Sequence, residues 1–405
     1  MEWLTGWNYR KKIRIKGVDG AGTGYQILLK VGESSGAFDY DFHLEGHSEN
    51  FPFGKNHSGD LRFVSSDQKS LFPIWVEKVE GTAPNRTAYV WIKILSSLDN
   101  DMDIYCYYGN ANADNVSNGD DVFEFFDDFD GDSLDTSKWE LYGSVSLSVS
   151  SEGLTCTAGA LTFGGIKTKF PFVSRNIAFE AKGQLHTADS ITMYITDYSP
   201  TDNPWWTKEW YRIHFQDTRY FLFQRFTDVD GGAVSLYQDN INPSIKYRVI
   251  GLLIGDTTIT YSRDYVSQSI DTCQFEINDN LWLNLTVWDR GSGTYNWVRV
   301  RKYVSSEPSF YSADTEEVCP VIVFGVACDK YGRPIIGKEV KVFVFDKDNG
   351  KLLGQTLTDH YGKWECQVPV SPGTKVVTLL ILEGEYYGDV DIVGAGFHVT
   401  QEMES

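Results

Sequence analysis

Short runs of β-branched and aromatic residues recur from one end of the chain to the other, and they constrain its fold more than any other feature. Residues 88–94 (AYVWIKI), 210–215 (WYRIHF) and 281–288 (LWLNLTVW) are examples. Such residues are enriched in strands, and many short strands between turns are typical of sandwiches and jelly rolls. Helical spacing of apolar residues is rare, with its best candidate at 121–125. The chain is therefore expected to be all-β.

Two polar, turn-rich segments divide the chain. One covers residues 110–119 (NANADNVSNG) and the other covers 305–317. At 405 residues the chain is also too long for one ordinary core. We therefore expect three consecutive domains: a β-sandwich at 1–120, a jelly roll at 121–312 and a small sandwich at 313–405.

The charge balance excludes one class of partner. The chain has 36 Lys and Arg residues against 56 Asp and Glu residues, which gives a formal net charge of −20. Nucleic-acid affinity comes mostly from basic residues that displace counterions from the phosphates. We therefore expect no nucleic-acid partner.

The chain shows no segment that marks a membrane or secretory route. No stretch approaches the roughly 20 apolar residues of a membrane span. The first residues, MEWLTGWNYR, lack the basic, apolar and small-residue order of a signal peptide. We therefore expect no membrane span and no export.

The six cysteines have no Cys-x-x-Cys spacing, and one disulfide among Cys319, Cys328 and Cys366 is an open alternative.

The N-terminal segment carries an ordered series of short motifs. These are WNYRKKI at 7–13, DFHLEGH at 41–47, DLRFV at 60–64, PIWVE at 73–77, VWIK at 90–93 and IYCYYGN at 104–110. The series resembles an uncharacterised "domain of unknown function" family that opens many tailed-virus structural proteins and archaeal or bacterial surface proteins. The resemblance covers residues 1–120.

Two further resemblances follow along the chain. Residues 125–139 (FFDDFDGDSLDTSKW) and 297–308 (WVRVRKYVSSEP) resemble the first and closing strands of a concanavalin A-like, or laminin-G-like, jelly roll. Residues 323–335 (VFGVACDKYGRPI) and 353–364 (LGQTLTDHYGKW) resemble a small carboxypeptidase-regulatory-like Ig sandwich. None of the three resemblances implies a conserved enzyme activity.

Motifs for catalysis are also missing from the sequence. Concanavalin A-like glucanases place paired carboxylates along one strand as Glu-x-Asp-x-x-Glu, and the nearest segment here, EIND at 276–279, has the wrong spacing. The chain has no Gly-x-Ser-x-Gly elbow, phosphate loop or His-Glu-x-x-His motif. We therefore expect that the protein is not an enzyme.

The densest group of carboxylates falls in the first strand region of the expected jelly roll. Five aspartates occur within nine residues: Asp127, Asp128, Asp130, Asp132 and Asp135. Ca²⁺ takes six to eight oxygen ligands in flexible geometry, and unpaired carboxylates this close repel each other. The group predicts a structural Ca²⁺ site and no other cofactor. The alternative is a solvated acidic turn.

A second candidate site combines aromatic and polar residues in one loop. Trp205 and Trp206 follow a proline, and Asp197, Asp202 and Asn203 precede them. Exposed ring faces stack on sugars while polar groups bond the sugar hydroxyls, so these five residues are candidates for glycan binding. The alternatives are ordinary core packing and an aromatic protein–protein contact.

Together these features favour a structural virion protein of a tailed virus, in the tail, baseplate or fibre. We expect it to lie on the virion surface, contact other virion proteins and bind a host-surface glycan or protein. A homo-oligomer would multiply weak contacts into avidity. The alternatives are a decoration protein without a ligand site, an extracellular adhesin on a cell surface, and a carbohydrate-active enzyme with two carboxylates about 5–9.5 Å apart.

Overall fold

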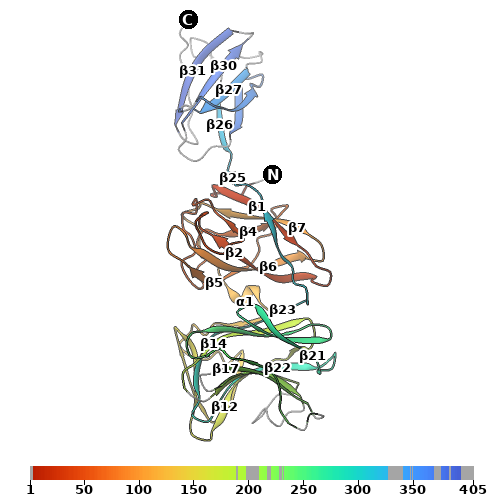
Figure 1. Ribbon diagram of the computed structural model, residues 1–405. Coiled ribbons are helices and arrows are strands. Elements are labelled where there is room, and N and C mark those ends of the chain that lie inside the picture. Colours follow the sequence, from red (N-terminus) through yellow and green to blue (C-terminus); the bar gives the residue numbers. More distant parts are fainter. Residues whose placement is uncertain are drawn as a thin grey trace.

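The computed structural model describes residues 3–187, 190–197, 209–216, 220–227, 230, 232–326, 341–346, 348, 350–368, 375–382 and 385–393 (Figure 1). Strands make up nearly all regular structure in this part of the chain, with one short helix, α1 (Gly119–Val122). The expected all-β class is therefore confirmed. No helix among the described residues is long and apolar enough to cross a membrane.

The first sandwich consists of two sheets. One has the order β24-β1-β7-β4, with β25 also paired to β1, and the other has the order β3-β2-β6-β5. Their bounds are β1 (Tyr9–Lys16), β2 (Thr23–Gly32), β3 (Phe42–His43), β4 (Arg62–Ser65), β5 (Ile74–Glu80), β6 (Thr87–Ser97), β7 (Met102–Tyr108), β24 (Ser309–Ala313) and β25 (Glu317–Val318).

The return of the chain to this sandwich corrects one expectation. The segment 305–317, interpreted above as a break, contains β24 and the start of β25, which pair with β1. Phe310 and Ala313 pack against the first core, so the segment has apolar anchors among its polar residues. Strand β24 spans residue 312, where the sequence places a domain boundary.

The second sandwich has the two large sheets of a jelly roll. The proximal sheet has the order β10-β11-β23-β14-β19-β20-β21, with β8 on β23, and the distal sheet has the order β18-β17-β16-β15-β22-β12-β9, with β13 on β22. The first half of the strands are β8 (Phe125–Asp127), β9 (Trp139–Gly143), β10 (Val145–Ser150), β11 (Gly153–Ala158), β12 (Phe163–Thr168), β13 (Phe172–Val173), β14 (Ile177–Leu185) and β15 (Ser190–Thr196). The second half are β16 (Trp210–Gln216), β17 (Tyr220–Phe226), β18 (Val234–Asp239), β19 (Arg248–Ile254), β20 (Thr258–Arg263), β21 (Val266–Thr272), β22 (Asn280–Trp288) and β23 (Ser292–Lys302).

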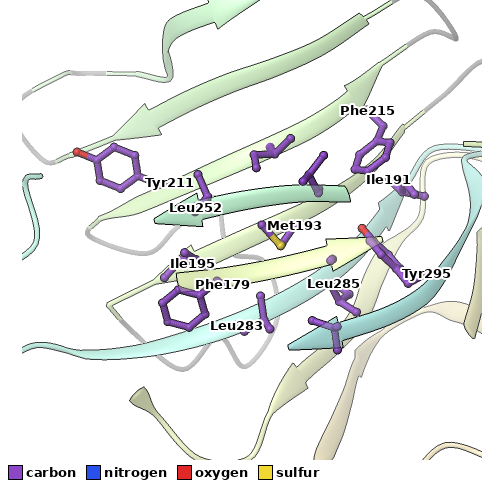
Figure 2. Packing of buried hydrophobic residues seen from close by; sticks show 14 of the residues in the cluster. Phe179, Ile191, Met193, Ile195, Tyr211, Phe215, Leu252, Leu283, Leu285 and Tyr295 are labelled. Carbon is purple, nitrogen blue, oxygen red and sulfur yellow. The ribbon is translucent and has the colours of Figure 1, made fainter. Parts of the chain in front are cut away.

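Alternation along these strands builds the jelly-roll core. Successive side chains of a strand point to opposite faces, so every second residue of each sheet enters the space between the sheets. Figure 2 shows Ile191, Met193 and Ile195 of β15 packed with Leu283 and Leu285 of β22, and these side chains are fully buried. The residues between them therefore point outward.

A third unit, which we name the third sandwich, follows β25. Its described strands form a pair, β26-β29, and a sheet of order β28-β27-β30-β31. The bounds are β26 (Val321–Val326), β27 (Lys341–Asp346), β28 (Leu352–Leu357), β29 (Lys363–Val368), β30 (Lys375–Leu382) and β31 (Glu385–Val393). The Ig-like assignment of this body stays a prediction.

A buried ionic cluster joins the first two sandwiches. Arg299 of the proximal sheet donates to Glu180 (2.7 Å) and across the junction to Glu77 of the first sandwich (3.1 Å), and Arg301 also donates to Glu180 (3.1 Å). Trp91 of the first sandwich donates to Glu77 at 2.9 Å. The two glutamates and two arginines are all within 2% of full burial.

Aromatic rings surround this cluster. The Arg299 guanidinium lies 4.0 Å from the ring centre of Trp91 and 4.4 Å from that of Trp297. Trp75 and Trp297 meet edge to face across the junction at 5.8 Å. A buried charge that loses its partner costs several kcal/mol, so the cluster holds the two sandwiches in one relative position.

The cluster makes the free energy of unfolding depend on pH. Burial raises the pKa of Glu180, but Arg299 and Arg301 outweigh burial and lower it from 4.5 to about 2. The carboxylate therefore contributes stability that is complete above about pH 5 and is lost as the pH falls toward 2, on the order of 3 kcal/mol in all. Urea unfolding of Glu180→Gln should show lower stability at pH 6 and a flatter decline between pH 5 and 2.5.

The exposed Glu152 gives a matched control, because its side chain lies outside the cluster. Glu152→Gln should leave both the stability at pH 6 and its decline in acid unchanged. An unchanged acid decline in Glu180→Gln would show that other carboxylates control the transition.

Candidate functional site

The two sheets of the jelly roll have different surroundings. The outer side of the proximal sheet carries Glu180, Val249, Trp297 and Arg299, which pack against the first sandwich. Strands β12 and β17 of the distal sheet lie farther from that sandwich than β14 and β23 (Figure 1). We name the outward side chains of β9, β12, β15, β16, β17 and β22 the distal face. A ligand can approach this face without displacing the first sandwich.

A row of polar residues crosses the distal face, one from each of five neighbouring strands. In order across the sheet these are Lys167, Asn284, Tyr194, Arg212 and Gln224. Arg212 donates to Tyr194 Oη at 2.6 Å and to Gln224 Oε1 at 2.7 Å. The register of the strands, which places the five residues side by side, therefore produces a fixed set of hydrogen-bonding groups.

Strand β22 adds a tryptophan on each side of that row. Its outward residues are Trp282, Asn284, Thr286 and Trp288, between the buried Leu281, Leu283, Leu285 and Val287. Trp288 is 45% exposed and pairs in register with Phe163 and Ser190. The two tryptophans are six residues apart on an extended strand, which separates them by about 20 Å. The sequence analysis missed both, although the alternation with leucine and valine in 281–288 was the available signal.

His214 lies next to the polar row, on the same strand as Arg212. Its Nδ1 atom is 3.2 Å from Thr192 Oγ1, and the side chain is buried. Burial and the neighbouring charge of Arg212 lower the pKa of His214 from 6.5 to about 3. The ring is therefore neutral at physiological pH and offers one donor and one acceptor.

Two buried polar atoms on the distal face have no hydrogen-bond partner among the described residues. They are Asn284 Oδ1 and Tyr142 Oη. The Asn284 amide nitrogen is used, since it donates to Thr196 Oγ1 (3.2 Å) and to the Trp282 carbonyl (3.0 Å). Buried polar atoms without partners cost free energy, and ordered water or a ligand commonly satisfies them.

The predicted glycan loop connects two neighbouring strands of this face, β15 and β16. Trp205, Trp206, Asp202 and Asn203 lie outside the described residues. Asp197 is described, and it closes the base of the loop: its Oδ1 accepts from the Glu209 amide at 3.1 Å, and its own amide donates to the Glu209 carbonyl at 3.3 Å. The loop therefore starts and ends on β15 and β16. The sugar-binding role of these five residues stays a prediction.

The aspartate group is divided among protein partners. Asp127 accepts from Trp139 Nε1 (2.6 Å) and from the Phe129 amide (2.8 Å). Asp128 accepts from Asn56 Nδ2 at 2.5 Å, and Asn56 in turn accepts from Trp75 Nε1 at 2.6 Å. The two buried aspartates therefore serve the jelly-roll core and the junction with the first sandwich.

The other three aspartates lie in the turn that follows. Asp135 Oδ1 accepts from the amide and hydroxyl of Ser137, and Asp130 and Asp132 are exposed. Within the described ranges, no group of three or more His, Cys, Asp or Glu side chains is arranged to hold a metal ion. The calcium site stays a prediction.

Comparison with known families and structures gives a partial match. Domain of unknown function (DUF2341) matches residues 57–142, which reach from the first sandwich across α1 into β9. The comparison with curated proteins gives no match.

Three solved structures illustrate the likeness in fold. The laminarinase catalytic domain of Thermotoga petrophila is 9% identical, with 45% of this chain and 97% of that chain covered and a TM-score of 0.37. The endo-β-1,3-glucanase of Pyrococcus furiosus is 12% identical, with 47% and 95% covered and a TM-score of 0.39. The β-glucanase of Bacillus licheniformis is 17% identical, with 44% and 97% covered and a TM-score of 0.35.

The environment of His214 predicts how its ring titrates. The ring should stay neutral from pH 8 to pH 5 in the folded protein, because burial and Arg212 disfavour the charged form. The unfolded chain takes up a proton near pH 6.5, so this residue lowers stability as the pH falls from 6.5 toward 3. Ring ¹⁵N chemical shifts measured across this pH range test the first statement.

Arg212→Gln is the control variant that tests whether the charge of Arg212 lowers the pKa of His214. It removes the neighbouring charge and leaves the ring on the same sheet, so the pKa of His214 should rise while staying below 6.5. A His214 ring that titrates near pH 6.5 in the unaltered folded protein would show that water reaches it freely.

Proposed function

We propose that the chain is a carbohydrate-binding attachment protein and that the distal face of its jelly roll binds the sugar. The observation that carries this proposal is strand β22, whose outward side carries the exposed Trp288 and the half-buried Trp282 on either side of the buried Asn284 and Thr286. Aromatic ring faces stack on the apolar side of a sugar, and amides and hydroxyls bond its hydroxyl groups. One strand thus presents both kinds of contact.

The dimensions of the face indicate the length of the ligand. The tryptophans are about 20 Å apart, which is longer than one sugar ring. The row of Lys167, Tyr194, Arg212 and Gln224 runs across the strand direction beside Asn284, and its four side chains are buried at 2–8% exposure. The face therefore suits an oligosaccharide rather than a single sugar. The loop with Trp205 and Trp206 starts beside it and would add further ring faces.

The chemistry of the distal face favours binding without cleavage. Glycoside hydrolysis commonly uses two carboxylates that flank the scissile bond. Among the described outward residues of the six strands, the carboxylate is Glu140, an exposed residue on the edge strand β9, 3.5 Å from Lys167. The assignment as a non-enzyme is part of the proposal.

The wider setting is also proposed. The match of residues 57–142 to a domain of unknown function supports the resemblance of the first sandwich to an uncharacterised family, and the virion setting rests on the sequence resemblance alone. We place the protein on a virion surface, in contact with other virion proteins, and as a homo-oligomer whose repeated distal faces bind a host glycan with avidity. A structural Ca²⁺ at the aspartate group belongs to the same proposal.

Binding to a glycan array and to host cells tests the sugar site directly. Trp288→Ala should weaken binding of the full chain at least tenfold, because it removes an exposed stacking surface and leaves the buried side of β22 intact. Trp205→Ala combined with Trp206→Ala should weaken it similarly if the loop contributes. Product analysis with the bound glycan should show no cleavage, and EDTA should reduce binding if calcium orders the domain.

Phe38→Ala is the matched control, since Phe38 is 86% exposed on the first sandwich and lies outside the distal face. It should leave binding unchanged. A folded protein that binds no glycan, or whose binding ignores Trp288→Ala, would contradict the proposed site and favour a decoration protein. Released sugar products would contradict the non-enzyme assignment.

A further inference from the structure

The chain leaves the jelly roll and returns along the outer edge of the first sandwich. We name residues 309–319 the strap. Its strand β24 pairs with β1 from Lys16↔Ser309 to Ile13↔Ala313, and β25 pairs at Arg10↔Glu317 and Tyr9↔Val318. The third sandwich begins directly after it, at Val321. The strap is therefore the segment through which the third sandwich is joined to the first.

Acidic side chains in the second half of the strap contact basic residues and a tyrosine of the first sandwich. Asp314 lies 3.1 Å from Lys12, and Glu317 lies 2.6 Å from Arg10. Glu316 accepts from Tyr108 Oη at 2.8 Å and lies 2.9 Å from His47 Nδ1. All the acidic partners belong to the strap, and their partners belong to the first sandwich.

Apolar contacts hold only the first half of the strap in the described structure. The Phe310 ring stacks on Phe42 with centres 6.1 Å apart, and Ala313 also touches the first core. The amide of Asp314 donates to the Lys12 carbonyl (2.8 Å), and the amide of Cys319 donates to the Asn8 carbonyl (2.7 Å). From residue 314 onward, attachment therefore rests on charge pairs and edge hydrogen bonds.

The two junctions of the first sandwich differ in kind. The ion pairs of the jelly-roll junction are buried, with Arg299 at 0% and Glu77 at 1% exposure. Each strap pair has at least one side chain open to water: Asp314 is 57% exposed, Glu317 is 41% exposed opposite the buried Arg10 (7%), and His47 is 47% exposed opposite Glu316 (13%). Salt screens exposed charges much more than buried ones, and at 1 M the screening length is about 3 Å.

We propose that residues 314–318 form a releasable electrostatic clasp that fixes the third sandwich to the first. The clasp opens from the Val318 end, because the antiparallel pairing places Tyr9 and Val318 at the end that adjoins the third sandwich. Opening lets the third sandwich move while Phe310 holds β24 and the jelly-roll junction stays closed. The relative position of the third sandwich thus responds to ionic strength.

Hydrogen exchange in the full chain tests the clasp. The readouts are the amides of Asp314 and Cys319, and the reference is the amide of Glu124, which donates to the Val300 carbonyl at 2.9 Å beside the jelly-roll junction. Raising NaCl from 0.05 to 1 M should speed exchange at both strap amides about tenfold more than at Glu124. Glu317→Gln should have the same effect at low salt and should reduce the response to added salt.

Glu80→Gln is the control variant. It removes an exposed ion pair with Lys78 within β5, 2.8 Å long, on the sheet of the first sandwich that does not contain β1 or the strap. Strap exchange should stay unchanged in it. Strap amides that exchange in step with Glu124 under every condition would overturn the proposal, because the strap would then open only with the whole unit. Strap exchange that ignores both salt and Glu317→Gln would overturn it as well.

Discussion

The buried contact between Arg299 and the two glutamates Glu77 and Glu180 is the constraint on which the arrangement of the first two sandwiches depends. A guanidinium this deeply buried needs both carboxylates, one from each sandwich, because the loss of either leaves an unpaired charge away from water. The aromatic rings of Trp91 and Trp297 cover it on the remaining sides. Any relative rotation of the sandwiches would break these contacts together, so the pair behaves as one body.

This constraint decides which sheet of the jelly roll has an outer side that the first sandwich does not cover. The proximal sheet uses its outer residues to build the junction, and the distal sheet thereby faces away from the first sandwich (Figure 1). The path to the third sandwich, after Val318, leaves from the edge of the first sandwich. The third sandwich therefore lies on the other side of the first sandwich from the distal sheet (Figure 1).

The local pattern of apolar and polar residues was sufficient to predict the all-β class and the strands, because their alternation is visible in segments such as 281–288. It could also have assigned Trp282 and Trp288 to one side of a strand. It could not show which sheet of the jelly roll packs against the first sandwich, since that depends on the contact between Arg299 and Glu77, 222 positions apart. The aspartate group shows a similar limit of the sequence: its density is local, but the hydrogen-bond partner of Asp128 is Asn56, 72 positions earlier.

Under the proposed function, the polar row of the distal face is a preorganised site. Arg212 is held by Tyr194 and Gln224 before any ligand arrives, so little side-chain freedom is left to lose on binding. Its charge also keeps His214 neutral, which preserves an acceptor nitrogen that protonation would remove. Uncharged donors and acceptors match the hydroxyl groups of a sugar, which need both. The same buried network that stabilises the sheet therefore sets the hydrogen-bonding pattern offered to a ligand.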